Sequence, residues 1–321
     1  MKAIVQDRFG PPTDVLRLEE VNAPAVGAGD ALVRVEAAGV NAADWHLVAG
    51  LPLVMRAAFG GRRPKEPVPG LDVTGRVEAV GADVEDVAPG DEVFGWCTGA
   101  FAELVRVPAG QLVRRPAGIS AVQAATLPTA GCTALQGWRL AGLAAGNRVL
   151  VTGASGGVGT FAVQIAKARG AHVTGVCSTG NVELVRGLGA DEVVDYSRDP
   201  VPPRDGRYDV IFHLAGRVPL PALRGALTPT GTLVLSTGDG GPWFGPLPFI
   251  ARAVALGRLG RLRVRLLTTK PDRGDLAQLA DLVAGAAVTP VLDRTYSLDE
   301  APAAVAYLQQ GHTRGKVVIT P

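Results

Sequence analysis

Hydrophobic and polar positions alternate differently in the two parts of the chain. Up to about residue 120, short apolar runs are separated at close intervals by glycine and proline turns, as at 27–30 and 89–91. Such spacing predicts a compact domain of short strands. The predicted strands cover residues 31–36, 74–80, 91–95 and 102–107.

From about residue 120 the pattern changes to apolar runs that alternate with helical segments or loops. Helices are predicted at 121–126 and 133–143, and buried strands at 148–153, 172–178, 192–196, 209–215 and 231–236. Buried strands that alternate with helices are typical of a parallel sheet covered on both faces. We therefore predict an α/β fold, with a doubly wound domain at 121–269 following a β-rich domain at 1–120.

The last fifty residues predict a helix at 273–286, a strand at 291–296, a helix at 298–309 and a strand at 315–320. We expect this segment, 270–321, to pack partly back on the first domain.

A glycine-rich turn, Gly153-Ala154-Ser155-Gly156-Gly157-Val158-Gly159, joins a predicted strand to an amphipathic helix. In this setting Gly156 lets the backbone approach a pyrophosphate, and Gly159 lets the helix lie close to the sheet. The helix N-terminus offers unpaired N–H groups to the anion. The alternative is a turn without a ligand. We predict a dinucleotide site that includes Ser155, Gly156, Gly157, Val158 and Gly159.

The ribose end of a dinucleotide is expected just after the second strand, where enzymes that prefer NAD often carry an acid. This chain has Ser178 and Thr179 there, and no acid. We expect both residues and Tyr196 to contact a 2′-phosphate, with Arg186 or Arg198 as cationic help. The predicted cofactor is therefore NADPH.

Charge and composition exclude several classes of partner. The formal net charge is +2, and the arginines are scattered among acids, so no nucleic-acid face is expected. No apolar run reaches the roughly 18 residues of a membrane span, and the first residues do not resemble a signal peptide. We expect a cytoplasmic protein. Cys97, Cys132 and Cys177 lack paired or zinc-type spacing and are expected to be small buried hydrophobes.

Four segments besides the phosphate turn carry a family resemblance: AGVNAAD at 38–44, VPGLDVTG at 68–75, PGDEVFG at 89–95 and GKVV at 315–318. Together they resemble the zinc-independent quinone oxidoreductase, or zeta-crystallin, branch of the medium-chain dehydrogenase/reductase superfamily. The resemblance covers the whole chain. It implies a GroES-like catalytic domain at 1–120 that is completed by 270–321, a Rossmann domain at 121–269, an active site in the cleft between them and a homodimer.

Compared with the zinc-dependent alcohol dehydrogenases of that superfamily, the metal-ligand positions are changed. This chain has Asn41 at the first, Leu71 and Asp72 at the second and Thr129 at the third. Zinc needs several converging N, S or carboxylate donors, and one plausible donor remains. We predict no metal site. Without a Lewis acid, alcohol oxidation loses transition-state stabilisation, whereas a conjugated carbonyl can accept hydride and spread the charge onto its oxygen.

The resemblance also suggests roles for individual residues. Asn41 is expected to hydrogen-bond the cofactor or the substrate carbonyl, the alternative being a turn-capping amide. His46 is a candidate proton donor or an exposed helical histidine. Thr129 is a candidate to orient the acceptor oxygen. Lys316 matches a position near the cofactor, the alternative being a surface lysine, and Asp44 is expected to be structural.

Two predicted strands end at the sheet edge where ligands bind in such folds. Leu214 and Ala215 lie at the end of one strand, and Ser236 and Thr237 lie at the end of the next. We expect their backbone to contact the nicotinamide half, whereas His213 is expected to be a core residue. Candidates for an aromatic wall of the acceptor pocket are Trp45, Phe59, Trp96, Trp243, Phe244 and Phe249.

The leading hypothesis is an NADPH-dependent, zinc-independent oxidoreductase that transfers hydride to a quinone or α,β-unsaturated carbonyl. The alternatives are an enoyl or alkenal reductase of a biosynthetic pathway, a zinc-free alcohol dehydrogenase, and a non-catalytic, crystallin-like NADPH-binding protein. No nucleic-acid or membrane partner is expected.

Overall fold

The computed structural model describes residues 1–199, 205–216, 218–236, 240–260, 262–311 and 313–321. Contacts between residues divide the chain into two compact units. Unit 1 consists of Met1–Cys132, Lys270–Ala286 and Pro290–Pro321, and unit 2 consists of Thr133–Thr269 and Ala287–Thr289.

Unit 1 is built on a mixed seven-stranded sheet with the order β14-β15-β3-β4-β5-β7, in which β6 also pairs with β3. The strands predicted in the first third of the chain are confirmed, although the central one continues to Val40. They are β3 (Asp30–Val40), β4 (Asp72–Val80), β5 (Glu92–Trp96) and β6 (Leu104–Pro108). The short β7 (Leu112–Arg114) was not predicted. Alternate β3 residues such as Val33 and Val35 enter a buried core with Val73 and Phe101.

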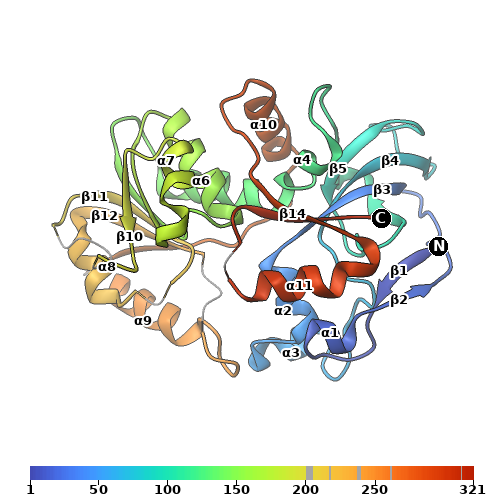
Figure 1. Ribbon diagram of the computed structural model, residues 1–321, viewed down its shortest axis with the longest axis horizontal. Helices are drawn as coiled ribbons and strands as arrows, with labels where there is room; N and C mark the ends of the chain where they lie inside the picture. The colour runs from blue at the N-terminus through green and yellow to red at the C-terminus, as the bar shows by residue number, and fades with distance from the viewer. Residues whose placement is uncertain (200–204, 217, 237–239, 261, 312) are drawn as a thin grey trace. The chain divides into compact units, whose positions relative to one another are not determined.

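The C-terminal segment adds two strands to this sheet. β15 (Lys316–Thr320) pairs antiparallel with β3, and β14 (Leu292–Ser297) pairs parallel with β15. In Figure 1 this red segment lies beside the blue β3, with α11 (Ala301–Gln309) next to them. The pairing brings residues about 280 positions apart in sequence into contact.

Shorter elements surround the sheet of unit 1. β1 (Lys2–Val5) and β2 (Arg17–Glu20) form an antiparallel pair, and α1 (Pro12–Val15) lies between them in the chain. The helices and helical turns that remain are α2 (Ala42–Ala49), η1 (Leu53–Met55), α3 (Arg56–Phe59), η2 (Ala109–Gln111), α4 (Ala121–Ala124), the π-helical turn η3 (Leu127–Gly131), α10 (Arg273–Ala284) and η5 (Leu298–Glu300).

Unit 2 contains a six-stranded, all-parallel sheet with the order β10-β9-β8-β11-β12-β13. Its strands are β8 (Arg148–Thr152), β9 (His172–Cys177), β10 (Glu192–Asp195), β11 (Tyr208–His213), β12 (Leu227–Leu235) and β13 (Arg263–Leu266). The predicted doubly wound α/β fold is confirmed. Strand order reverses between β8 and β11, and ligands of such sheets bind beyond the strand ends at this point.

Helices cover both faces of the sheet in unit 2 (Figure 1). They are α5 (Cys132–Ala141), α6 (Gly157–Ala168), α7 (Val182–Gly187), α8 (Leu220–Ala226) and α9 (Leu247–Arg258), with the turn η4 (Thr179–Asn181) before α7. None of the helices in the described ranges is long and apolar enough to cross a membrane.

Close packing of α5 depends on one glycine. A Cβ atom on Gly137 would lie 2.3 Å from the ring of Phe212, so the absent side chain makes room for that ring. The next residue, Trp138, meets Phe212 edge to face and donates its indole N–H to the carbonyl of Ala162 on α6. These contacts join α5 and α6 to β11, one of the two strands between which the strand order reverses.

Candidate functional site

The predicted phosphate turn connects β8 to α6 in unit 2. Gly153 has φ of +68°, a conformation that favours glycine, and its carbonyl accepts the N–H of Gly156. A Cβ atom on Gly159 would lie 2.0 Å from that carbonyl, whereas a Cβ atom on Gly156 would meet protein only at 3.4 Å. Helix α6 begins with Gly157 and Val158, whose N–H groups belong to the helix turn that lacks intrahelical acceptors.

A buried amide joins this turn to the loop after β9. Asn181 donates from Nδ2 to the hydroxyls of Ser155 (3.1 Å) and Ser178 (3.2 Å). Because each hydroxyl accepts in these bonds, each keeps its own hydrogen for another acceptor. Asn181 Oδ1 is buried, with no hydrogen-bond partner in the described part of the chain. The sequence analysis did not single out Asn181, although its place before α7 is a visible signal.

An acid is present at the predicted ribose end, on the neighbouring strand. Asp195 ends β10 opposite Cys177 of β9, and it accepts the hydroxyl hydrogen of Thr179 at 2.6 Å. This hydrogen bond lowers the pKa of Asp195. Asp195 also holds the exposed Arg198 at 3.6 Å. This carboxylate was not predicted, because the prediction of the ribose end rested only on the residues that follow β9.

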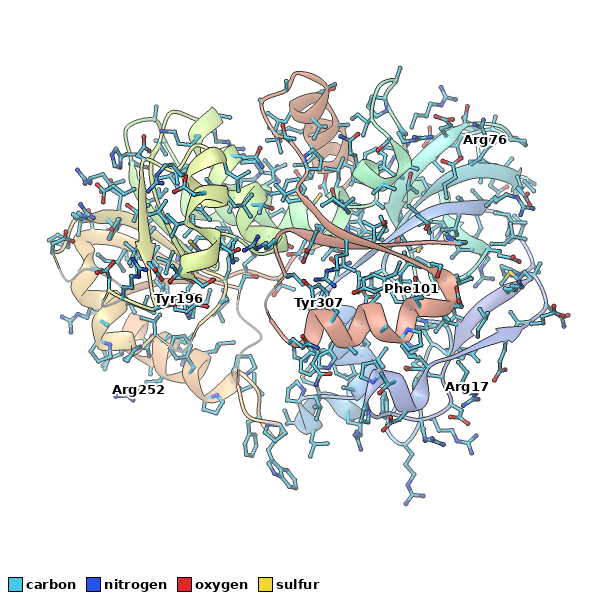
Figure 2. All side chains as sticks on the ribbon, in the orientation of Figure 1. Arg17, Arg76, Phe101, Tyr196, Arg252 and Tyr307 are labelled. Carbon is cyan, nitrogen blue, oxygen red and sulfur yellow. The ribbon has the colours of Figure 1, made fainter. Side chains whose placement is uncertain are left out.

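The other residues predicted near the 2′-phosphate differ in their surroundings. Tyr196 is 55% exposed, and Figure 2 labels it on the ribbon of unit 2. Arg186 pairs with Glu183 on α7. Of the two arginines considered, Arg198 is therefore the one that shares a partner with the Thr179 loop.

The ends of β8 and β11 are joined through one hydroxyl. Thr152 Oγ1 accepts the N–H groups of Leu214 (3.0 Å) and Ala215 (3.3 Å), so its own hydrogen points to His213 Nδ1 at 2.9 Å. His213 Nδ1 is therefore the acceptor, and a neutral ring carries its hydrogen on Nε2.

These bonds restrict the predicted nicotinamide contacts. The N–H groups of Leu214 and Ala215 are taken by Thr152, and the N–H of Ser236 donates to the carbonyl of His213. A ligand contact with these three residues would use their other atoms. Thr237 lies outside the described residues.

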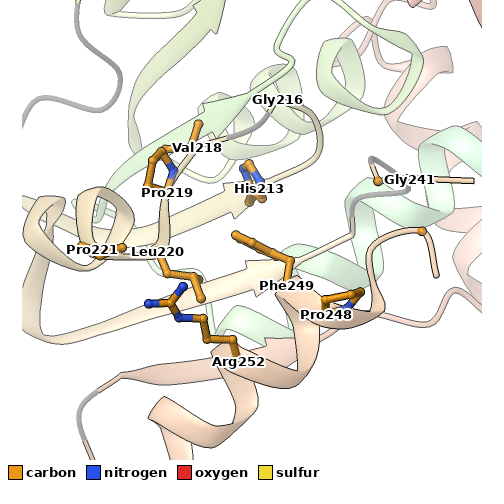
Figure 3. Close-up of a pocket in the computed structure, with 12 residues that line it drawn as sticks. His213, Gly216, Val218, Pro219, Leu220, Pro221, Gly241, Pro248, Phe249 and Arg252 are labelled. Atoms are coloured by element: carbon orange, nitrogen blue, oxygen red, sulfur yellow. The ribbon is translucent and has the colours of Figure 1, made fainter. Parts of the chain in front are cut away.

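A cavity of about 800 Å³ opens beside the end of β11 in unit 2. Figure 3 shows His213, Phe249 and Arg252 directed toward it. Phe249 is one of the predicted aromatic wall residues, whereas Trp243 and Phe244 are exposed and do not line this cavity. The remaining lining residues are Gly216, Val218, Pro219, Leu220, Pro221, Gly240, Gly241, Gly245 and Pro248.

In unit 1, Asp72 is the centre of a buried polar cluster that joins two predicted catalytic residues. Its Oδ1 accepts the backbone N–H (3.1 Å) and the hydroxyl (2.5 Å) of Thr129. Its Oδ2 accepts Asn41 Nδ2 at 2.9 Å and lies 3.7 Å from Lys316 Nζ. Burial raises the pKa of Asp72, and Lys316 and these hydrogen bonds oppose the rise. From the sequence, Asp72 was predicted only to lie at a changed metal-ligand position, and this role was not predicted.

Lys316 is 3% exposed, so the alternative of a surface lysine is wrong. Its ammonium donates to the carbonyl of Val40 (3.0 Å) and to Asn41 Oδ1 (2.5 Å). Burial lowers the pKa of Lys316, while the charges of Asp72 and Asp44 act in the opposite direction.

Asp44 has the structural role expected, together with an unusual ionisation. Its Oδ2 accepts the backbone N–H of Asn41 at 2.7 Å, at the start of α2, and its Oδ1 is buried without a hydrogen-bond partner among the described residues. Burial, followed by the charge of Asp72, raises the pKa of Asp44 to about 7.

His46 is partly buried rather than an exposed helical residue, and its ring hydrogen-bonds to the backbone. Its Nδ1 lies 3.1 Å from the carbonyl of Leu51, so Nδ1 carries a hydrogen. Its ring packs against Trp45, with centroids 4.3 Å apart.

The donor set around Asp72 does not fit a zinc ion. Asn41, Asp72 and Thr129 do converge, but their polar atoms are satisfied by one another and by an ammonium group. Zinc would need lone pairs directed at a common point. Within the described ranges, no group of three or more His, Cys, Asp and Glu side chains is arranged to hold a metal. Cys97, Cys132 and Cys177 are all buried.

A doubly wound unit with a phosphate turn and a separate β-rich unit define a dinucleotide-dependent dehydrogenase or reductase in fold. Residues 27–117 match the alcohol dehydrogenase GroES-like domain, and residues 188–319 match the zinc-binding dehydrogenase family. The chain is 33% identical to the chloroplastic quinone-oxidoreductase QR1 of Triphysaria versicolor over 100% of this chain and 98% of that protein.

Two solved structures are similar over their full length. The quinone oxidoreductase of Coxiella burnetii has a TM-score of 0.87 and 29% identity, covering 100% of this chain and 99% of that one. Mycobacterial Rv1454c, solved with NADPH, has a TM-score of 0.84 and 27% identity, covering 100% of both chains. The chain belongs to the quinone oxidoreductase branch of the medium-chain dehydrogenase/reductase superfamily.

Proposed function

We propose that this protein is an NADPH-dependent oxidoreductase that transfers hydride, without zinc, to a quinone or an α,β-unsaturated carbonyl. The observation that carries the proposal is the cluster around Asp72. Positions that hold metal ligands in zinc-dependent relatives here form hydrogen bonds with one another and with Lys316. Unit 2 supplies the phosphate turn that a dinucleotide requires.

The residues of the turn fit a dinucleotide. The backbone of 156–159 and the start of α6 would hold the pyrophosphate, and the hydroxyl hydrogens of Ser155 and Ser178 are directed by Asn181 toward further acceptors. When bound, the reduced nicotinamide supplies a hydride. The chain itself binds and orients the reactants, and it excludes water from the reaction site.

NADPH is proposed rather than NADH because a cation lies beside the ribose loop. Asp195 contacts both Thr179 and Arg198, so the guanidinium shares a carboxylate partner with the residue that follows Ser178. In this arrangement Thr179 fixes the loop through its hydroxyl. Ser178, Tyr196 and Arg198 read the 2′-phosphate.

The acceptor requires a proton after hydride addition. His46 is the proposed donor: Leu51 fixes its Nδ1 hydrogen, so Nε2 is the nitrogen that gains and loses a proton. Asn41 and Thr129 complete the proposed reaction site. Homodimer formation and a cytoplasmic location stay predictions.

The experiment is a panel of quinones, 2-alkenals and secondary alcohols, assayed with NADPH and NADH at the absorbance band of the reduced nicotinamide. We expect turnover of quinones or alkenals with NADPH. Turnover of alcohols alone, dependent on added zinc, would overturn the proposal. Tight NADPH binding without turnover of any acceptor would favour a non-catalytic binding protein.

A further inference from the structure

We propose that Lys316 and Asp72 are positioning residues that hold the side-chain amide of Asn41 in one orientation, in which it offers an acceptor and no donor. The inference rests on the proposed function, since Asn41 belongs to the proposed reaction site. Asn41 was expected to hydrogen-bond the cofactor or the substrate carbonyl, and the inference limits it to accepting a hydrogen bond.

Both hydrogens of the Asn41 amide are used within unit 1. Nδ2 donates to Asp72 Oδ2 at 2.9 Å and to the carbonyl of Gly39 at 3.3 Å. Oδ1 accepts from Lys316 Nζ at 2.5 Å and has a second lone pair. A flipped amide would direct its N–H groups at the ammonium and its oxygen at the carboxylate. The charges of Lys316 and Asp72 therefore select one orientation.

The ionised form of Asp72 follows from its contacts. Oδ1 receives two donors from Thr129, and Oδ2 receives Asn41 Nδ2 and faces Lys316. Of these partners, only the hydroxyl oxygen of Thr129 could accept a carboxyl proton, and the charge of Lys316 opposes protonation of Asp72. Asp72 is thus the carboxylate that keeps the Asn41 N–H groups turned inward.

The fold places Lys316 beside Asn41 by strand register. Val317 pairs with Val40 across the antiparallel β15 and β3, so the preceding lysine lies next to the residue that follows β3. Close approach at this end of β3 depends on Gly39, because a Cβ atom there would lie 2.2 Å from the carbonyl of Ala125. The orientation of Asn41 is set by the sheet and not by a mobile loop.

The proposed consequence concerns the class of ligand group that Asn41 can bind. It can accept an N–H or O–H, such as a carboxamide N–H or a ribose hydroxyl, and it cannot donate to a carbonyl oxygen without breaking a bond. The hydroxyl of Thr129 is likewise directed at Asp72. Charge on the acceptor oxygen is therefore quenched by other groups.

The test compares Lys316→Met, Asp72→Asn and the double variant, with the exposed Lys2→Met as a matched control. Removing one member of a buried ion pair leaves an uncompensated charge, whereas removing both can be nearly neutral. We expect each single variant to lower the melting temperature and the double variant to recover it. In the double variant, the new amide at position 72 can turn the Asn41 amide around.

Three readouts follow: the melting temperature, the side-chain amide resonances of Asn41 by NMR, and kcat and KM with a quinone. In the double variant we expect shifted Asn41 resonances and kcat lowered by about 100-fold, with the melting temperature restored. A double variant that regains stability, the native resonances and the native kcat would show that the pair is merely structural.

The two proposals fail differently. If the unaltered protein reduces no acceptor, the proposed function fails, while the Asn41 resonances still decide the orientation. Unchanged Asn41 resonances in all three variants would overturn the positioning role whatever the activity.

Discussion

Asp44 illustrates how burial controls the chemistry of a single residue. Its side chain is fully buried, one oxygen caps α2 through the N–H of Asn41, and the other has no hydrogen-bond partner among the described residues. Burial and the charge of Asp72 raise its pKa from 3.8 to about 7. The carboxyl is therefore held in its protonated form up to near neutrality.

The first prediction is a pH-dependent stability. An acid whose pKa is raised on folding favours the folded state most below its unfolded value, and this contribution is lost as the pH rises to its folded value. For Asp44 the loss occurs between about pH 4 and about pH 7. Asp44→Asn should remove this slope and stabilise the protein at pH 8 by on the order of 2 to 4 kcal/mol.

Urea unfolding at several pH values measures this prediction. The exposed Asp83→Asn serves as the matched control and should keep the slope of the unaltered protein. If Asp44→Asn kept that slope as well, the ionisation assigned to Asp44 would be wrong.

The second prediction concerns Arg198, which lies 3.6 Å from Asp195 at the proposed ribose end. Arg198→Ala should raise the Kd for NADPH about 10-fold and leave that for NADH nearly unchanged, because a charged hydrogen bond to the 2′-phosphate is lost. Titration of each cofactor by fluorescence measures it. Arg186→Ala, which breaks a pair with Glu183 on α7, is the control. Equal weakening of both cofactors by Arg198→Ala would argue against a phosphate contact.

At the scale of elements, the turn after β8 and the start of α6 contain two glycines with different roles, Gly156 and Gly159. The Cβ atom that Gly159 lacks would lie 2.0 Å from the carbonyl of Gly153, so Gly159 keeps the helix close to the strand. The corresponding atom at Gly156 would meet protein only at 3.4 Å, so Gly156 leaves space at the helix N-terminus.

This contrast gives the third prediction. Gly159→Ala should destabilise the fold by about 1 to 3 kcal/mol, as overpacking does. Gly156→Ala should retain the melting temperature and weaken NADPH binding at least about 10-fold, because its methyl group would fill the space used by the pyrophosphate. Thermal unfolding and cofactor titration of both variants measure the two effects. Native NADPH affinity in Gly156→Ala would place the pyrophosphate elsewhere.

The same elements show what a sequence can and cannot predict. The strands of unit 2 were predicted within a few residues because apolar runs and turn residues are local signals. The short β13, whose sequence RVRL alternates with arginines, was missed. Asn41, Thr129 and Lys316 were predicted as site residues, but Asp72 was not predicted as their common partner. Asp72 meets Thr129 across 57 positions, and Lys316 meets Asn41 across 275, so only the folded sheet reveals the cluster.

At the scale of the whole molecule, the two units divide the proposed work. Unit 2 carries the phosphate turn, Asn181 after β9 and Arg198 after β10. Unit 1 carries a buried ion pair where zinc-dependent relatives place their ligands. A chain of this family with such a pair is suited to acceptors that do not need a Lewis acid, and a conjugated carbonyl is such an acceptor.

The most direct test of this central claim is NADPH oxidation by a quinone, measured on protein that has been treated with a strong chelator and shown by elemental analysis to contain no zinc. The account predicts that the chelated protein keeps its full kcat and that added zinc does not increase it. Loss of quinone reduction on chelation, restored by zinc, would contradict the account.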